Sequence, residues 1–129
     1  MISHFNLGTN DLERAEAFYN ELLSLFGGQQ LMKTERMLFY SLGDGSAKLA
    51  VNKPFNGEPA TAGNGTMVAI GASGRDQVDE CHAKALQLGA SCEGEPGERM
   101  DGMLYAAYFR DLDGNKFGVF YAPALGLGG

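Results

Sequence analysis

The chain has 129 residues, of which 44% are hydrophobic and 20% charged, so it can bury a core as one folded domain without disulfides. Ten Lys and Arg against 16 Asp and Glu give a formal net charge of −6, which disfavours a nucleic-acid partner. No apolar run approaches the ~20 residues of a membrane-spanning helix, and residues 1–13 do not resemble a secretory signal. We therefore expect a cytoplasmic protein with no nucleic-acid or membrane partner.

The first half of the sequence predicts a strand, a helix and three more strands. Residues 2–8 alternate as a strand does, and the next apolar residues recur at helical spacing. Asn10 is the expected N-cap of that helix, and Gly27-Gly28 the expected stop. Three strands follow, at 29–35, 36–42 and 46–52. A turn at 43–45 joins the last two, and the Pro- and Gly-rich stretch 53–64 predicts a linker.

The same order of elements is expected again after the linker. A strand at 66–72 precedes a helix that Ser73 caps and Gly89 ends. Three more strands are expected, at 90–95, 103–110 and 115–121. The triplet Asp113-Gly114-Asn115 predicts a tight turn before the last strand. The chain thus has the order β-α-β-β-β twice, and each helix has one apolar face that must lie on a sheet.

Two stretches carry recognisable motifs. Residues 4–23 (HFNLGTNDLERAEAFYNELL) contain D-L-x-x-A-x-x-F-Y, and residues 109–120 (FRDLDGNKFGVF) contain F-x-D-L-D-G-N. With the duplicated element order, the whole chain resembles the glyoxalase/bleomycin-resistance/extradiol-dioxygenase group, the vicinal oxygen chelate superfamily. The resemblance implies a single α+β domain and, by analogy, a homodimer. In that fold two βαβββ modules, here about 1–55 and 65–123, pair into a curved, mostly antiparallel eight-stranded sheet with a cleft and with helices on the outer face.

Many members of this family hold a divalent metal through the first and last strand of each module. The resemblance places these four positions at His4, Lys48, Met67 and Gly118. Only His4 supplies a usual donor, and Lys48 puts a positive charge where a cation would lie. We therefore expect no metal and no cofactor at these positions, and we do not expect the usual glyoxalase I chemistry.

The roles of His4 and Lys48 stay open at this point. Lys48 either anchors a carboxylate or phosphate, acts as a base, or extends into solvent. His4 is either a catalytic base or hydrogen-bond donor, or a side chain satisfied by its neighbours. One hypothesis is a metal-free protein that sequesters or senses a small organic ligand. The alternative is a divergent lyase or isomerase in which His4 and Lys48 are catalytic.

A third hypothesis, a structural subunit with a filled cleft, is disfavoured by small residues expected in the cleft. These are Ala50, Ala69, Gly71 and Gly118. The candidate substrate-binding residues are Asn6, Arg36, Phe39, Tyr40, Met67, Tyr105 and Gly118, with Tyr108 and Phe109 on the same strand as Tyr105. Aromatic walls with few polar groups suit a planar or amphipathic molecule.

The remaining candidates have structural interpretations beside functional ones. Phe55 and the stretch 93–103 are either a lid or solvent-facing connections. Cys81 lies on the apolar stripe of the second helix and is expected in the core, whereas His82 is expected at the surface or at its boundary with the core. For neither Cys81 nor Cys92 do we expect an acid–His arrangement that would make the thiol a nucleophile.

Overall fold

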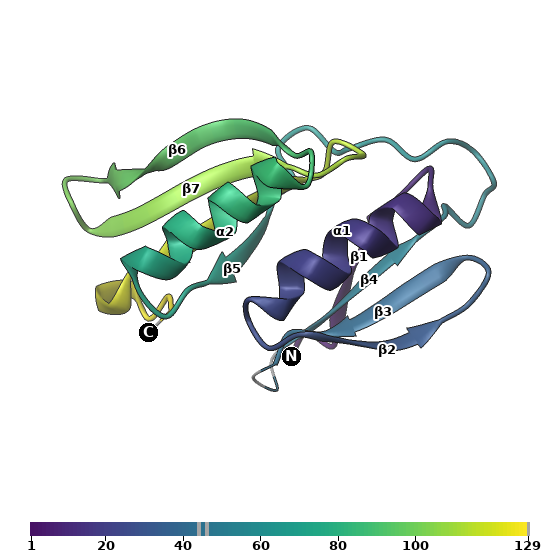
Figure 1. Cartoon of the computed structure of the whole chain (residues 1–129), viewed down its shortest axis with the longest axis horizontal. Coiled ribbons are helices and arrows are strands. Elements are labelled where there is room, and N and C mark those ends of the chain that lie inside the picture. The colour runs from purple at the N-terminus through teal and green to yellow at the C-terminus, as the bar shows by residue number, and fades with distance from the viewer. Residues whose placement is uncertain (44, 46, 129) are drawn as a thin grey trace. The chain divides into compact units, whose positions relative to one another are not determined.

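The computed structural model describes residues 1–43, 45 and 47–128. The chain divides into two compact units, Met1–Ala62 and Gly63–Gly129, each with the order strand, helix and three strands (Figure 1). The predicted α+β class and the repeated βαβββ order are confirmed. Within the described ranges, no helix has both the length and the apolar character needed to cross a bilayer.

The first unit is a four-stranded sheet with one helix. Its elements are β1 (His4–Gly8), α1 (Leu12–Ser24), β2 (Gln29–Lys33), β3 (Met37–Ser41) and β4 (Lys48–Asn52). The strand order is β1-β4-β3-β2, with β1 parallel to β4 and the other two pairs antiparallel. The register aligns Leu38 with Val51 and Tyr40 with Leu49, and these buried side chains form the face that α1 covers.

The second unit repeats this arrangement. Its elements are β5 (Val68–Gly71), α2 (Arg75–Gln87), β6 (Ser91–Arg99), β7 (Leu104–Arg110), β8 (Lys116–Tyr121) and a 3-10 turn at Pro123–Leu125. The strand order is β5-β8-β7-β6, with β5 parallel to β8, and α2 runs along one face of this sheet (Figure 1). On that face the rings of Phe109 and Phe117 stack at 5.4 Å and are fully buried.

The helix starts differ from the expectation. Asp11, not Asn10, is the N-cap of α1, because its side chain accepts a 3.0 Å hydrogen bond from the Arg14 N–H. Asn10 instead pairs with the linker, accepting from the Ala60 N–H at 2.7 Å and donating to the Ala60 carbonyl at 3.1 Å. The cap of α2 is Gly74 rather than Ser73, and no side chain bonds there.

The strand β6 is longer than expected. It extends through residue 99, so only residues 100–103 connect it to β7. The loop expected over 93–103, whether as a lid or as a solvent-facing connection, is therefore wrong for most of its length. Register shifts occur on both sides of Gly94, so the residues that resembled a loop form a bulged edge strand. In the first unit, the expected turn at 43–45 includes Asp44 and the strand expected at 46–52 begins with Ser46; both residues lie outside the described part of the chain.

The second motif builds the β7–β8 hairpin. The Asp111 carboxylate accepts from the backbone N–H groups of Asp113 and Asn115 at 2.9 and 2.8 Å. It also accepts from the Asn115 side-chain amide at 2.9 Å. Gly114 has φ of 88°, a conformation that side chains disfavour. The predicted turn is therefore confirmed, and this motif has a structural role.

Candidate functional site

In the first unit, the face of the sheet opposite α1 carries the polar candidates. Parallel register pairs His4 with Lys48 and Asn6 with Ala50, and antiparallel register pairs Ala50 with Phe39. Residues opposite one another in a ladder project to the same side of the sheet. The structure therefore brings His4, Asn6, Lys48 and Phe39 to one face, which we call the His4–Lys48 face.

The imidazole of His4 is oriented by contacts within its own unit. Its Nδ1 lies 2.8 Å from the Ser3 hydroxyl, and the ring meets Phe39 edge-on at a centroid distance of 5.5 Å. The side chain as a whole is exposed. An oriented, accessible imidazole can exchange a proton with a bound molecule.

Lys48 is half-buried beside His4. Among the described residues, its ammonium makes no hydrogen bond or ion pair. Four residues along β4, Asn52 donates from its amide nitrogen to the Lys53 carbonyl at 3.2 Å, while its buried Oδ1 has no partner among the described residues. Sequence reasoning did not select Asn52, although the two-residue period from Lys48 through Ala50 places it on the same face.

Two other candidates of the first unit lie elsewhere. Arg36 precedes β3 in the hairpin turn, donates to the Lys53 carbonyl at 3.2 Å and places its guanidinium 5.4 Å from the ring centroid of Phe55. Phe55 itself is 91% exposed. Tyr40 lies under α1, where its hydroxyl donates to Asn20 Oδ1 at 2.8 Å. Neither Arg36 nor Tyr40 joins the His4–Lys48 face.

In the second unit, the face opposite α2 is aromatic and cationic. Gly118 pairs with Tyr108, so both lie on this face. Phe120 meets Tyr108 edge-on at 5.6 Å, and the cations of Arg99 and Lys116 lie 5.8 and 5.5 Å from the Tyr108 ring centroid. Cations over an aromatic ring are attracted to its electron-rich face.

The space above Gly118 is occupied. A Cβ at Gly118 would lie 2.9 Å from a ring carbon of Phe120 and 3.2 Å from the Met67 sulfur. The room expected there is therefore absent, because Phe120 and Met67 fill it. Tyr105 lies on the opposite, helix-covered face, where its hydroxyl donates to Asp79 at 2.6 Å. That hydrogen bond is the main cause that raises the pKa of Tyr105.

The four positions that the family resemblance assigns to a metal carry side chains that do not fit a divalent cation. They supply an imidazole, an ammonium, a thioether and no side chain at all, at His4, Lys48, Met67 and Gly118. The only usual donor, His4, is the direct register partner of the ammonium. Divalent metals in oxygen and nitrogen sites need several neutral or anionic donors. We therefore derive no chemistry through a metal at these positions.

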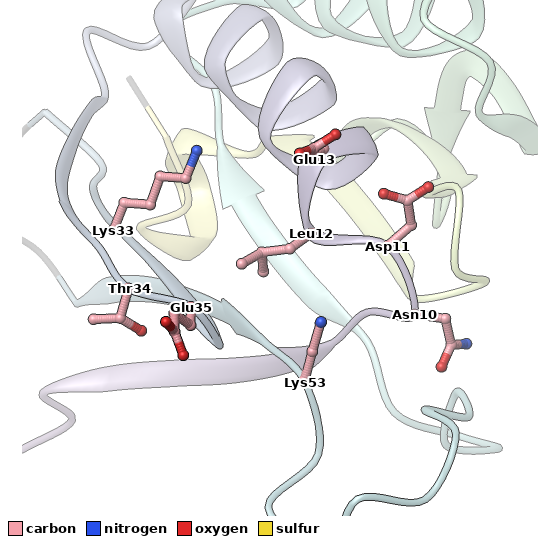
Figure 2. A pocket seen from close by; sticks show the side chains of 8 residues that line it. All are labelled: Asn10, Asp11, Leu12, Glu13, Lys33, Thr34, Glu35 and Lys53. Atoms are coloured by element: carbon pink, nitrogen blue, oxygen red, sulfur yellow. The ribbon is translucent and has the colours of Figure 1, made fainter.

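A separate hollow of about 440 Å³ lies beside the N-terminus of α1 (Figure 2). The residues that line it are Asn10, Asp11, Leu12, Glu13, Lys33, Thr34, Glu35 and Lys53. It combines three carboxylates with two ammonium groups, and Lys33 is paired with Glu16 at 2.9 Å. None of the sequence candidates lines this hollow, and its mixed charges favour no one class of ligand.

The structure corrects two expectations about the second helix and its neighbours. Cys81 is in the core as expected, and burial followed by the Glu80 charge raises the pKa of its thiol to about 12. His82, expected at the surface or at its boundary with the core, is only 3% exposed. Ligand atoms of His82, Cys92 and Glu95 lie within 4.8 Å of one another, so Cys92 does have an acid and a His nearby.

Comparison with known proteins defines the family. The model of the Glyoxalase/Bleomycin resistance protein/Dioxygenase superfamily matches residues 1–119, and the chain belongs to this superfamily. Its fold is similar to that of a glyoxalase/bleomycin resistance protein from Albidiferax ferrireducens, with 38% identity, 95% and 99% of the two chains covered, and a TM-score of 0.86. No curated protein matches the sequence.

Two further solved structures are more distant. A hypothetical protein from S. aureus is 25% identical, with 95% of each chain covered and a TM-score of 0.73. A lactoylglutathione lyase from Agrobacterium tumefaciens is also 25% identical, with 98% of this chain and 97% of that chain covered and a TM-score of 0.71. These comparisons establish the family of the chain. The names of the family and of its members include several different activities.

Proposed function

We propose that this chain is a glyoxalase-like protein that binds a small organic ligand with an anionic group, without the metal set usual in its family. The observation that carries the proposal is Lys48, a half-buried ammonium with no partner among the described residues. A carboxylate or phosphate of a ligand would supply the missing counter-charge. A half-buried charge is screened less by salt than an exposed one.

The surroundings of Lys48 support a ligand that also has an apolar body. The side-chain amides of Asn6 and Asn52 offer donors and acceptors on the same face, and no described residue bonds to the Oδ1 of Asn52. The ring of Phe39 provides an apolar surface next to His4. A few polar groups beside an aromatic wall are typical of small-molecule sites. An aromatic acid has the chemistry that this face would recognise.

The binding test uses simple aromatic probes. Benzoate and phenylphosphonate would be titrated against benzamide and benzylamine, with affinities measured by NMR chemical-shift changes. Binding of the anions should weaken about tenfold or more in Lys48→Gln, because a hydrogen-bonded ion pair is lost. Lys53→Gln removes an exposed lysine of the same unit and should leave affinity unchanged. Preferred binding of benzylamine, or equal effects of the two variants, would overturn the proposal.

A second candidate is a lyase or isomerase that uses His4 and Lys48. It is favoured by their direct pairing across β1 and β4. In such a reaction His4 takes a proton from a carbon next to a carbonyl, and the electron pair moves to the carbonyl oxygen, which Lys48 stabilises. The proton then returns to the neighbouring carbon, and the hydroxyl proton of the first carbon moves to the former carbonyl oxygen, so that the first carbon becomes the carbonyl. Solvent deuterium incorporation into the hemithioacetal of methylglyoxal and glutathione tests this step, and His4→Gln should abolish it.

The proposal includes the homodimer that the family resemblance implies. Light scattering coupled to size-exclusion chromatography measures the mass directly, and a dimer should be found at micromolar concentration. If the dimer completes the site, dilution to monomer should weaken binding of phenylphosphonate in step with dissociation. A monomer with full affinity would remove the dimer from the proposal and leave the role of Lys48 intact.

A further inference from the structure

A second cluster of possible ligands lies in the second unit, between α2 and the edge strand β6. His82 projects from α2 into the helix–sheet interface, on the buried side that also carries Val78, Cys81 and Ala85. Its side chain is 97% buried, and its Nε2 has no hydrogen-bond partner among the described residues. A buried polar atom without a partner is uncommon and destabilising.

The strand β6 brings two more donors to this point. Cys92 pairs with Phe109, whose buried ring lies on the helix-covered face, so the thiol faces α2. In a regular strand, Glu95 would point to the opposite face, because it is three residues further on. The register shifts beside Gly94 change this, and the Cys92 Sγ lies 3.5 Å from Glu95 Oε1.

The three side chains form one compact donor set. A nitrogen of His82, the sulfur of Cys92 and a carboxylate oxygen of Glu95 all lie within 4.8 Å of one another. Ligand atoms around a tetrahedral zinc ion are separated by roughly 3.3–3.8 Å, so small side-chain rotations complete the site. None of these residues is at the four positions that the family resemblance assigns to a metal.

We propose that His82, Cys92 and Glu95 bind a zinc ion at the edge of the second sheet. Imidazole, thiolate and carboxylate together are donors that zinc accepts, whereas magnesium and calcium prefer oxygen alone. Two anionic ligands and one neutral ligand balance the charge of a divalent cation. Cys92 and Glu95 are exposed, so the fourth coordination position is open to water.

A bound zinc ion would contact polar groups of both α2, through His82, and β6, through Cys92 and Glu95. Zinc would give the buried imidazole a partner and would tie α2 to β6, the last strand of its sheet. Zinc should therefore raise the melting temperature of the chain, and the rise should depend on Cys92.

The test uses the full chain under reducing conditions, with cobalt as a coloured substitute for zinc. One equivalent of Co²⁺ should give a thiolate-to-cobalt charge-transfer band, and zinc should displace it. Cys92→Ser should abolish the band, and Glu95→Gln should lower zinc affinity by at least ~10-fold, because one ligand of the set is lost. Both positions are exposed, so these variants should fold, which circular dichroism of the metal-free chains checks.

Two matched controls make the result specific. Glu93→Gln removes a carboxylate on the same strand that pairs with Arg110, and His4→Ala removes the exposed imidazole of the first unit. Neither should change the cobalt band or the zinc affinity. Absence of the band at stoichiometric cobalt, its survival in Cys92→Ser, or its loss in His4→Ala would overturn the zinc site. None of these results depends on whether Lys48 binds an anion.

Discussion

His4 and Lys48 are backbone partners in the parallel β1–β4 pair, so an imidazole and an ammonium project side by side from one face of the first sheet. Neighbouring strands lie about 4.8 Å apart, which is close enough for one small ligand to touch both groups. The positive charge of Lys48 favours an anion over a divalent cation beside it. Lys48 therefore supports the proposed anion-binding role at a position that the resemblance assigns to a metal ligand.

Gly118 should not accept a side chain. Gly118→Ala is expected to lower the free energy of unfolding by about 1–3 kcal/mol, because its Cβ would press on Phe120 and the Met67 sulfur. Urea denaturation measures the change. Gly74→Ala is the control: apart from its chain neighbours no atom lies within 4 Å of its Cβ position, so only the poorer N-cap preference of Ala should lower stability, by about 0.5 kcal/mol. Equal effects at the two glycines would contradict the packing described for Gly118.

Tyr40 should make the protein sensitive to alkaline pH. Burial, and then the Glu16 charge, raises its pKa in the folded state above the ordinary value of 10.0. The neutral phenol is thus favoured by folding, and this contribution is complete below pH 10.0 and decreases as the pH rises further. Stability of Tyr40→Phe should fall less steeply above that pH than stability of the wild type.

The same variant has a separate effect at neutral pH. Tyr40→Phe removes the hydrogen bond to Asn20 Oδ1 and should cost about 1 kcal/mol. The pKa of Cys81 is also raised in the folded state, so Cys81 lowers stability as the pH rises above its ordinary pKa of 9.0. This effect is the same in Tyr40→Phe and the wild type and cancels in the comparison. Identical alkaline slopes for Tyr40→Phe and wild type would show that Tyr40 is not buried as described.

The two cysteines should differ in reactivity. Cys92 is exposed, whereas Cys81 is buried and the pKa of its thiol is raised to about 12. Ellman's reagent should therefore label one thiol per native chain and two after denaturation in urea. Mass spectrometry of the native product should place the label on Cys92. Rapid labelling of Cys81 in the native chain would contradict its place in the core.

The Asp111 turn should contribute strongly to stability. Asp111→Ala leaves the N–H groups of Asp113 and Asn115 and the Asn115 amide without their acceptor. We expect a loss of about 2–4 kcal/mol by urea denaturation. Asp111→Asn keeps one acceptor oxygen, so its free energy of unfolding should lie between those of Asp111→Ala and the wild type. An unchanged midpoint in Asp111→Ala would show that this motif does not stabilise the hairpin.

The order of elements could be predicted because each one has a local cause. Apolar spacing gave both helices, and Gly114 in Asp113-Gly114-Asn115 gave the last hairpin. The exact caps were missed because Asn10 and Asp11 are adjacent and equally able to cap. The length of β6 was missed because Gly94 and its neighbours are typical of loops but here form bulges.

The candidate sites were predicted less completely. Phe39 and Tyr40 were both candidates from the sequence, and only the strand register puts Phe39, and not Tyr40, on the face of His4 and Lys48. The burial of His82 could have been predicted, because it lies four residues after Val78 on the apolar stripe. Its approach to Cys92 could not, since that depends on how α2 packs against the edge of the sheet. Local patterns do not contain this information.

The most direct test of the altered family site is the metal content of the Cys92→Ser chain, which lacks the thiolate of the zinc site proposed for the second unit. The protein would be dialysed with nickel, zinc, manganese and iron in turn, freed of excess and analysed by mass spectrometry for metal per chain. The expected ratio is near zero, because His4 is the one usual donor among the four family positions. A ratio near one in Cys92→Ser, lost when His4→Ala is added to make the double variant, would contradict this account. It would restore a metal to the His4–Lys48 face.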